Sequence, residues 1–121
     1  MKDTGAYKKQ AQLFHALSHP VRLRILDVLA RQEACVCHLT AFLGKRQPYV
    51  SQQLAALREA GLVIDRREGT LIYYRLADDR LAGLLDQSKA LARNPQGENA
   101  DFPSVPKGPL ANCPCPACQK A

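Results

Sequence analysis

The sequence predicts a mainly α-helical domain that carries one β-hairpin. Residues 7–61 repeat apolar side chains at helical spacing, and Gly44 divides the last part of this region into two short helices. Residues 62–76 then switch to β-branched and aromatic residues around Glu68-Gly69, which is typical of a hairpin. A helix, a tight turn, a second helix and a hairpin, in this order, predict a winged helix-turn-helix.

The helices before the turn are marked by apolar spacing and by capping residues. Residues 7–17 are expected to form the first helix, with apolar contacts from Tyr7, Leu13, Phe14 and Leu17. Ser18 or His19 can cap a second helix, which Pro20 starts and which runs to about Arg31. A short third helix covers roughly Cys37 to Leu43 and ends at Gly44.

The stretch from Gln47 to Gly61 has the start and stop of a helix. Pro48 suits a first turn, and Gly61 suits the left-handed residue that follows a helix. Val50, Leu54 and Leu57 form one buried stripe, and short polar side chains at the start can reach base edges in a major groove. A solvated amphipathic helix would show the same spacing. The candidate DNA-contacting residues of this helix are Gln47, Tyr49, Ser51 and Gln52.

The predicted hairpin has a cationic tip formed by Arg66 and Arg67. A basic hairpin directly after such a helix indicates a wing on the DNA backbone, where both arginines contact phosphate or enter the minor groove. The alternative is that these charges only keep an exposed hairpin in solution.

The chain is expected to divide after residue 93. Asp78 or Asp79 can cap a last helix, whose apolar face serves either dimerisation or packing on its own subunit. Residues 94–112 are rich in Pro, Gly and Asn and lack apolar periodicity. Residues 1–93 are therefore predicted to be a DNA-binding and dimerisation domain, and residues 94–121 a flexible tail ending in a cysteine cluster.

The charge and the composition of the chain restrict the possible binding partners and the cellular compartment. The chain has 121 residues, a net charge of +6 and a pI near 9.3, which favours nucleic acid or an anionic membrane surface as partner. No apolar run approaches the roughly 20 residues that span a bilayer, and no signal peptide is apparent. We therefore expect a cytoplasmic protein without a membrane partner. Its five cysteines would be reduced there and available as metal ligands or redox thiols.

Over about residues 7–92 the chain resembles the ArsR/SmtB family of bacterial winged-helix metalloregulators. The motifs that carry the resemblance are Leu17-Ser-His-Pro-Val-Arg-Leu-Arg-Ile-Leu26, Ala34-Cys-Val-Cys-His-Leu39, Gln47-Pro-Tyr-Val-Ser-Gln-Gln-Leu54, Leu57-Arg-Glu-Ala-Gly-Leu-Val63 and Arg66-Arg-Glu-Gly-Thr-Leu-Ile-Tyr-Tyr-Arg-Leu76. The resemblance implies a homodimer that represses transcription from a palindromic operator. It also implies release of the operator when a metal or metalloid ion binds.

The chain departs from the family pattern at several ligand positions. Family members often have Asp or Glu where this chain has His38, and one arsenic-sensing type has a cysteine where this chain has Thr40. Members with zinc sites on the last helix use acidic and His ligands, whereas this helix has Asp79 and Asp86 but no His. A zinc site on the last helix is therefore not expected. The tail cysteines lie outside the family pattern.

Cysteine spacing predicts how an ion site must be built. Thiolates are soft ligands that select Zn²⁺ and Cu⁺ and, by the same softness, Cd²⁺, Pb²⁺ and trivalent arsenic or antimony. Within a regular helix Cys35 and Cys37 would point about 200° apart, so if they share one ion Cys35 must precede the helix or lie in a distorted first turn. The tail spans roughly 25 Å between Arg93 and Cys113 if it is flexible. Cys113, Cys115 and Cys118 can therefore join Cys35 and Cys37 or bind an ion by themselves.

These observations predict a non-enzymatic repressor that an ion releases from double-stranded operator DNA. Trivalent arsenic or antimony is the favoured effector and Cd, Pb or Zn the next, bound by cysteine thiolates without an organic cofactor. The alternative is a thiol-redox-sensing repressor that uses the same cysteines. A thioredoxin-like enzyme is not expected, because the Cys115–Cys118 spacing lies in a tail without a βαβ setting. Buried structural cysteines and idle tail thiols are the plain alternatives.

Overall fold

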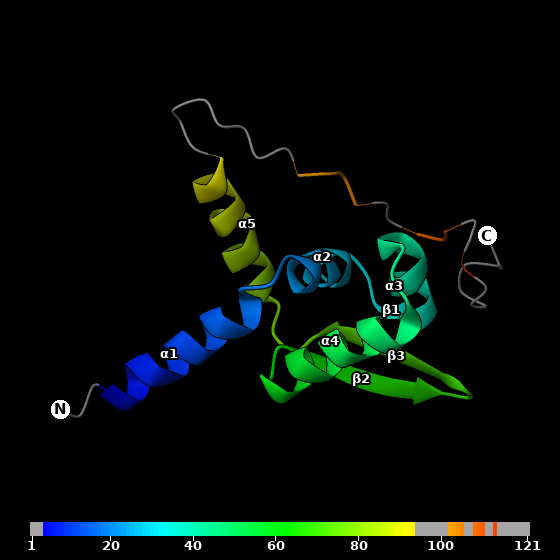
Figure 1. Ribbon diagram of the computed structural model, residues 1–121, viewed down its shortest axis with the longest axis horizontal. Coiled ribbons are helices and arrows are strands. Elements are labelled where there is room, and N and C mark those ends of the chain that lie inside the picture. Colours follow the sequence, from blue (N-terminus) through cyan, green and yellow to red (C-terminus); the bar gives the residue numbers. More distant parts are fainter. Residues whose placement is uncertain (1–3, 94–101, 106–107, 111–112, 114–121) are drawn as a thin grey trace.

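The structure, a computed structural model, describes residues 4–93, 102–105, 108–110 and 113. Three helices pack over a small sheet, and two further helices project from the side opposite the hairpin tip (Figure 1). In chain order the elements are α1 (Thr4–Leu17), α2 (Pro20–Leu29), β1 (Ala34–Cys35), α3 (Val36–Leu43), α4 (Gln47–Glu59), β2 (Val63–Glu68), β3 (Leu71–Leu76) and α5 (Arg80–Ala92). The mainly α-helical winged helix-turn-helix predicted from the sequence is confirmed.

Helix ends lie within a few residues of the predicted ones, and their caps are visible. The His19 Nδ1 accepts from the Val21 N–H at 3.2 Å and caps α2. Gly44 has φ 64° and ends α3, and Gly61 has φ 76° just after α4. Asp78 accepts from the Arg80 N–H at 2.9 Å at the start of α5. Three helix ends differ from the prediction. Helix α1 begins earlier, at Thr4, α2 ends earlier, at Leu29, and α3 begins earlier, at Val36.

The sheet contains a strand that the sequence did not predict. Its order is β1-β3-β2 with antiparallel pairing, and β1 pairs Ala34 with Tyr74 and Cys35 with Tyr73. A strand of two residues is too short to show an alternating pattern, so periodicity could not reveal it. Its pairing ties the cysteine segment directly to the hairpin.

The core lies between α2, α3, α4 and the sheet. The predicted stripe of Val50, Leu54 and Leu57 is fully buried, and Ile25, Leu26 and Leu39 are its fully buried neighbours on α2 and α3. Burial of a side chain of this size contributes about 1.5–3 kcal/mol to stability. This core holds α3 and α4 at a fixed relative position, which a helix-turn-helix requires.

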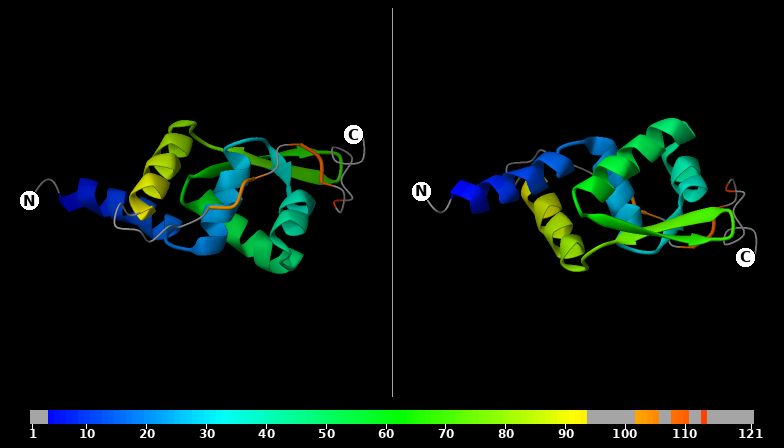
Figure 2. Two further views of the ribbon diagram at one scale, coloured as in Figure 1. Left: turned by 90° about the horizontal axis from the view of Figure 1, so that it is seen from above. Right: turned by 90° about the horizontal axis from the view of Figure 1, so that it is seen from below.

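Some apolar side chains of the projecting helices are exposed in the single chain, whereas Leu17 of α1 and Leu81 and Leu85 of α5 are buried. Tyr7 is 68% exposed, Phe14 49% and Leu91 84%. The expectation that Tyr7 and Phe14 make apolar contacts is therefore wrong within one subunit, because α1 extends away from the core (Figures 1 and 2). No helix among the described residues is long and apolar enough to cross a membrane.

The described parts of the tail lie against the folded domain. Residues 102–105 pass over α2 in the view from above, and residues 108–110 lie farther toward α3 (Figure 2). Val105 packs on the core, and the Phe102 ring lies below the cations of Lys89 and Arg93 at 5.4 and 5.2 Å. The division after residue 93 stays a prediction. Cys115 and Cys118 lie outside the described residues.

Candidate DNA interface and cysteine site

The start of α4 presents polar side chains to solvent. Gln47, Ser51 and Gln52 are exposed, and Tyr49 is partly buried beside the His19 ring, with the ring centroids 6.5 Å apart. Gln53 is instead turned inward, where its Oε1 accepts from the Arg22 Nε at 2.8 Å. Gln47, Tyr49, Ser51 and Gln52 therefore share the leading edge of α4. Their contact with DNA stays a prediction.

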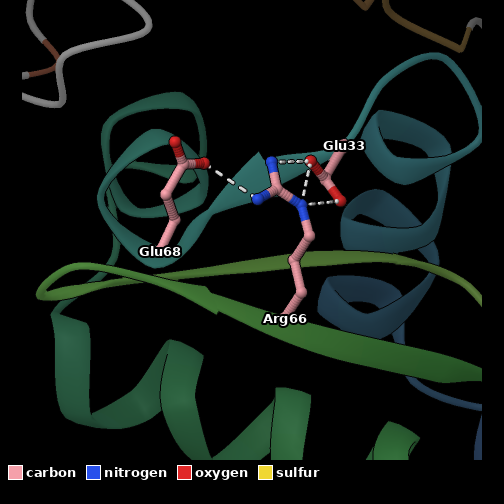
Figure 3. A network of polar contacts seen from close by, with 3 residues as sticks. All are labelled: Glu33, Arg66 and Glu68. Carbon is pink, nitrogen blue, oxygen red and sulfur yellow. Dashed lines mark hydrogen bonds and ion pairs between the residues drawn. The ribbon is translucent and has the colours of Figure 1, made fainter.

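The two candidate arginines of the wing have different surroundings. They are adjacent in β2 just before the turn, so their side chains leave opposite faces of the hairpin. Arg66 donates to Glu33 at 2.6–2.9 Å and to Glu68 at 2.8 Å (Figure 3), and its guanidinium lies 4.7 Å from the centroid of the Tyr73 ring. The hydrogen bonds to Glu33 and Glu68 raise the pKa of Arg66.

Because of these contacts, the two arginines differ in how available their positive charges are for binding DNA. The charge of Arg66 is matched by two carboxylates, and a phosphate would have to replace them. Arg67 is exposed and has no ion pair among the contacts within the described residues. Both remain predicted DNA contacts, and Arg67 is the one whose cation is available without rearrangement.

Cys35 occupies the position that a shared ion site requires. It lies in β1 and forms the N-cap of α3 with extended backbone angles, φ −83° and ψ 166°. Its Sγ accepts from the His38 N–H at 3.4 Å. Because Cys35 precedes the helix rather than lying in it, its sulfur can turn toward that of Cys37 in the first turn.

The tail brings a third sulfur to this pair. The Sγ atoms of Cys35, Cys37 and Cys113 all lie within 4.8 Å of one another. Cys35 is 2% exposed and Cys113 0%, and Ala41, Tyr73 and Leu110 pack around them. The Cys113 N–H donates to the Leu110 carbonyl at 3.2 Å, and this turn brings the thiol to the cluster. No other group of at least three His, Cys, Asp or Glu in the described part of the chain has this arrangement.

Burial and crowding keep the Cys37 thiol protonated. Burial is the largest cause that raises the pKa of Cys37, and the neighbouring Cys35 and Cys113 raise it further. Three sulfurs held at about 2.3 Å by a tetrahedral ion would lie roughly 3.8 Å apart, so a small inward movement would close the cluster on an ion. The donor set is entirely soft and therefore fits a thiophilic ion.

His38 is buried beside the cluster, but its ring nitrogens are not among the three potential ligand atoms. Its Nε2 lies 3.2 Å from the Gln32 Nε2, and burial lowers the pKa of the imidazole. Three residues were missed by the sequence analysis: Tyr73, which packs against the cluster, Gln32, which contacts His38 and Gly108, and Glu33, which binds Arg66. No local pattern could have revealed them, because their contacts come from packing between elements distant in sequence.

Known proteins place the chain in one family. Residues 19–65 match the model of the bacterial regulatory protein, arsR family. The biofilm growth-associated repressor of Agrobacterium fabrum is 46% identical over 86 residues, which cover 71% of this chain and 74% of that protein. The chain belongs to the ArsR family. The arsenic resistance transcriptional regulator ArsR1 of Pseudomonas putida is 36% identical over 107 residues, covering 82% of this chain and 84% of that protein.

A solved structure supports the same assignment. The homodimeric winged helix-turn-helix DNA-binding domain Mb0332 of Mycobacterium bovis superposes with a TM-score of 0.71 and 31% identity, covering 85% of this chain and 94% of that one. This ArsR-family protein is thus a transcriptional regulator and not an enzyme. The family match contains Cys35 and Cys37 but ends before Cys113. The inclusion of Cys113 in the cysteine site therefore rests on the geometry of this chain and not on the family match.

Proposed function

We propose that this ArsR-family regulator is a homodimeric repressor that leaves its operator when a thiophilic ion binds Cys35, Cys37 and Cys113. The observation that carries the proposal is the cluster of three sulfurs within 4.8 Å, two of them buried, in one chain. One similar protein is named as an arsenic resistance regulator. Cys115 and Cys118 remain proposed as further ligands from the tail.

The raised pKa of the Cys37 thiol favours trivalent arsenic or antimony as effector. Arsenous acid and three thiols form a neutral tris-thiolate and three waters, so each sulfur gives up its proton to a departing hydroxide. A divalent ion such as Cd²⁺, Pb²⁺ or Zn²⁺ must instead expel the thiol protons into solvent and leaves a net negative site. Burial of an uncompensated charge is unfavourable. The divalent ions are therefore the second choice.

The exposed apolar faces support the homodimer. Tyr7 and Phe14 on α1 and Leu91 on α5 would be covered if these helices met a second copy. The similar Mycobacterium bovis domain is described as homodimeric. Two-fold symmetry would place two copies of α4 about 34 Å apart, the spacing of successive major grooves on one side of DNA.

DNA contact is assigned to the leading edge of α4 and to the wing. Gln47, Tyr49, Ser51 and Gln52 would meet base edges or phosphates, and Arg67, together with Arg66 if its carboxylates yield, would meet the backbone. The net charge of +6 supports a polyanionic partner. No organic cofactor enters the proposal.

The ion site is connected to both DNA-contacting elements. Cys35 and Cys37 lie at the start of α3, and the Gly44 turn joins the end of α3 to α4. Cys35 also pairs with Tyr73 of β3, across from Arg66 of β2. Contraction of the sulfurs around an ion would therefore act on α3 and on the wing together. A coupling free energy of about 1–3 kcal/mol is enough to change operator affinity.

The proposal is tested by operator binding in fluorescence anisotropy under reducing conditions. Arsenite, antimonite, Cd²⁺, Pb²⁺ and Zn²⁺ are titrated separately against the full chain and against Cys113→Ser. Release by arsenite or antimonite near stoichiometric concentration, weakened in Cys113→Ser, is the expected result. The double variant Cys115→Ser/Cys118→Ser is the matched control for tail thiols. Its loss of release would add those cysteines to the ligand set.

Thiol oxidation is the second candidate, favoured by the same closeness of the sulfurs. Two thiols within 4.8 Å can form a disulfide, giving two protons and two electrons to an oxidant such as hydrogen peroxide, which is reduced to water. The raised pKa of Cys37 makes its thiolate scarce, which slows such a reaction. Release by peroxide without any ion, reversed by a dithiol reductant, would establish this function instead.

A further inference from the structure

The side chain of Gln32 holds the tail through the backbone N–H and the backbone carbonyl of one residue, Gly108. Gln32 lies in the loop between α2 and β1, and its Oε1 accepts from the Gly108 N–H at 2.6 Å. Its Nε2 lies 3.4 Å from the Gly108 carbonyl oxygen and 3.2 Å from the His38 Nε2. One side chain of the folded domain thus bonds the donor and the acceptor of the same tail residue.

The roles in this clamp follow from its chemistry. Since the Gln32 oxygen accepts from Gly108, the amide nitrogen faces the Gly108 carbonyl and the His38 ring and can donate one hydrogen to each. A carboxylate of the same size could accept from the Gly108 N–H but could donate to neither partner. Gly108 has φ 101°, a conformation that other residues rarely adopt. The clamp therefore requires an amide on one side and glycine on the other.

The clamp lies a short distance before the third thiol. Gly108 precedes Cys113 by five residues, which span at most about 17 Å when fully extended. The Cys113 N–H bonds the Leu110 carbonyl, and Leu110 packs against the cluster. Fixing Gly108 therefore raises the effective concentration of the Cys113 thiol at Cys35 and Cys37.

We propose that Gln32 is a positioning residue that docks the tail on its own subunit and thereby delivers Cys113 to the cysteine cluster. The inference rests on the proposed function in one respect, since Cys113 matters for sensing only as an ion ligand. Docking itself needs no ion, because the hydrogen bonds of the clamp involve protein groups alone. The third sulfur is then in place before the ion arrives, and the ion does not have to order the tail.

Docking is measured by the rate at which a thiol-alkylating reagent labels Cys113 in the reduced full chain, with peptide mass spectrometry to resolve each cysteine. In the native protein Cys113 is 0% exposed and should label slowly. Gln32→Ala should speed its labelling by about tenfold, the size expected for the net loss of one or two hydrogen bonds. Labelling of Cys35, which the core holds, should change little.

Two further variants separate the clamp from packing and from general damage. Gln32→Glu keeps the size of the side chain and should also speed labelling, whereas a packing role would leave this variant like the native chain. Arg31→Ala changes the neighbouring exposed residue of the same loop and should keep the native rate. Native labelling rates of Cys113 in both Gln32 variants would overturn the inference.

Arsenite binding to the same proteins keeps the two proposals apart. Gln32→Ala should weaken arsenite affinity by about tenfold, as undocking lowers the effective concentration of Cys113, while X-ray absorption at saturation still shows three sulfurs. Cys113→Ser should weaken affinity further and show two protein sulfurs. Native arsenite affinity in Cys113→Ser would refute Cys113 as a ligand, and the labelling rates would still decide whether Gln32 docks the tail.

Discussion

At the scale of single residues, the position of Cys35 decides whether two neighbouring thiols can share an ion. As the N-cap of α3 it stands outside the helical repeat that would separate it from Cys37. Its sulfur also accepts a hydrogen bond from the His38 N–H, which holds the side chain at the start of the helix. Two cysteines two residues apart cannot bind one ion within a regular helix, but they can when the first of them is the N-cap.

We expect Cys35→Ser to retain operator binding and to lose release by arsenite. A serine hydroxyl can still cap α3, but it is a hard and weakly acidic donor that thiophilic ions do not select. Anisotropy with a labelled operator measures both properties in one titration. Undiminished release by this variant would move sensing to the remaining cysteines.

The pH dependence of ion binding should differ between arsenite and Cd²⁺. Burial and the neighbouring thiols raise the pKa of Cys37, so below that pKa an incoming Cd²⁺ must displace a proton. Its affinity should rise by about tenfold per pH unit for each proton released. Arsenous acid exchanges hydroxide for thiol without net proton release, and its affinity should stay nearly flat between pH 6 and 8. A Cd²⁺ affinity that stays flat over this range, with an arsenite affinity that falls as the pH rises, would contradict protonated thiols in the cluster.

Two adjacent glutamines provide a matched test of base contact. Gln52 is exposed on α4, while Gln53 bonds to Arg22 inside the subunit. Gln52→Ala should weaken binding to the operator by about 1–3 kcal/mol and leave binding to unrelated DNA unchanged. Gln53→Ala should lower thermal stability instead. An unaltered operator affinity in Gln52→Ala would remove this residue from the interface.

At the scale of elements, the wing is connected to the cysteine segment by more than its own turn. β3 pairs with β1 through Cys35 and Tyr73, and Arg66 of β2 lies over the Tyr73 ring. Arg66 also bonds Glu33 just before β1 (Figure 3). The wing therefore has contacts that change when the cluster closes. Arg66 belongs to this connection at least as much as to a DNA surface.

The two wing arginines should differ in the salt dependence of DNA binding. Arg67→Ala should weaken binding to all sequences and reduce the slope of log affinity against log salt by about one. Arg66→Ala should reduce the slope less, because its charge is already matched by Glu33 and Glu68. Titrations at several salt concentrations measure both slopes. Equal reductions would show that Arg66 leaves its carboxylates and contacts DNA, which would agree with the contact predicted from the sequence.

At the scale of the whole molecule, the projecting helices leave apolar surface that a second copy would cover. Leu91 is 84% exposed and lies on the helix adjoining the tail. Leu91→Glu should leave the subunit folded, because the side chain makes little contact there. It should nevertheless weaken the dimer and, with it, binding to a two-fold operator.

Analytical ultracentrifugation measures this effect directly. Ile64→Glu is a control of the same kind, since Ile64 is exposed on β2 and lies on neither of the projecting helices. The native chain and the control should sediment as dimers and Leu91→Glu should shift toward the monomer. A native monomer, or a Leu91→Glu dimer of unchanged affinity, would contradict the proposed interface.

The sequence by itself determined the local structure and the class of site. The stripe of Val50, Leu54 and Leu57, the glycines at 44 and 61 and the residues around Glu68-Gly69 each act over a few neighbouring positions, so their patterns predict the helices and the hairpin. The cysteine spacing also predicted that, if Cys35 and Cys37 share one ion, Cys35 precedes its helix or lies in a distorted first turn. The structure places Cys35 before the helix, as its N-cap.

Only the tertiary structure decided which distant groups meet. The clamp between Gln32 and Gly108 joins residues 76 positions apart, and Cys113 reaches the cluster through it and through the turn at Leu110. The same holds for Arg66, whose carboxylate partner Glu33 lies 33 positions away. Periodicity records which face of an element is apolar, but the partner of that face depends on how the elements pack, and so the ligand set and the charge available on the wing could not be read from local spacing.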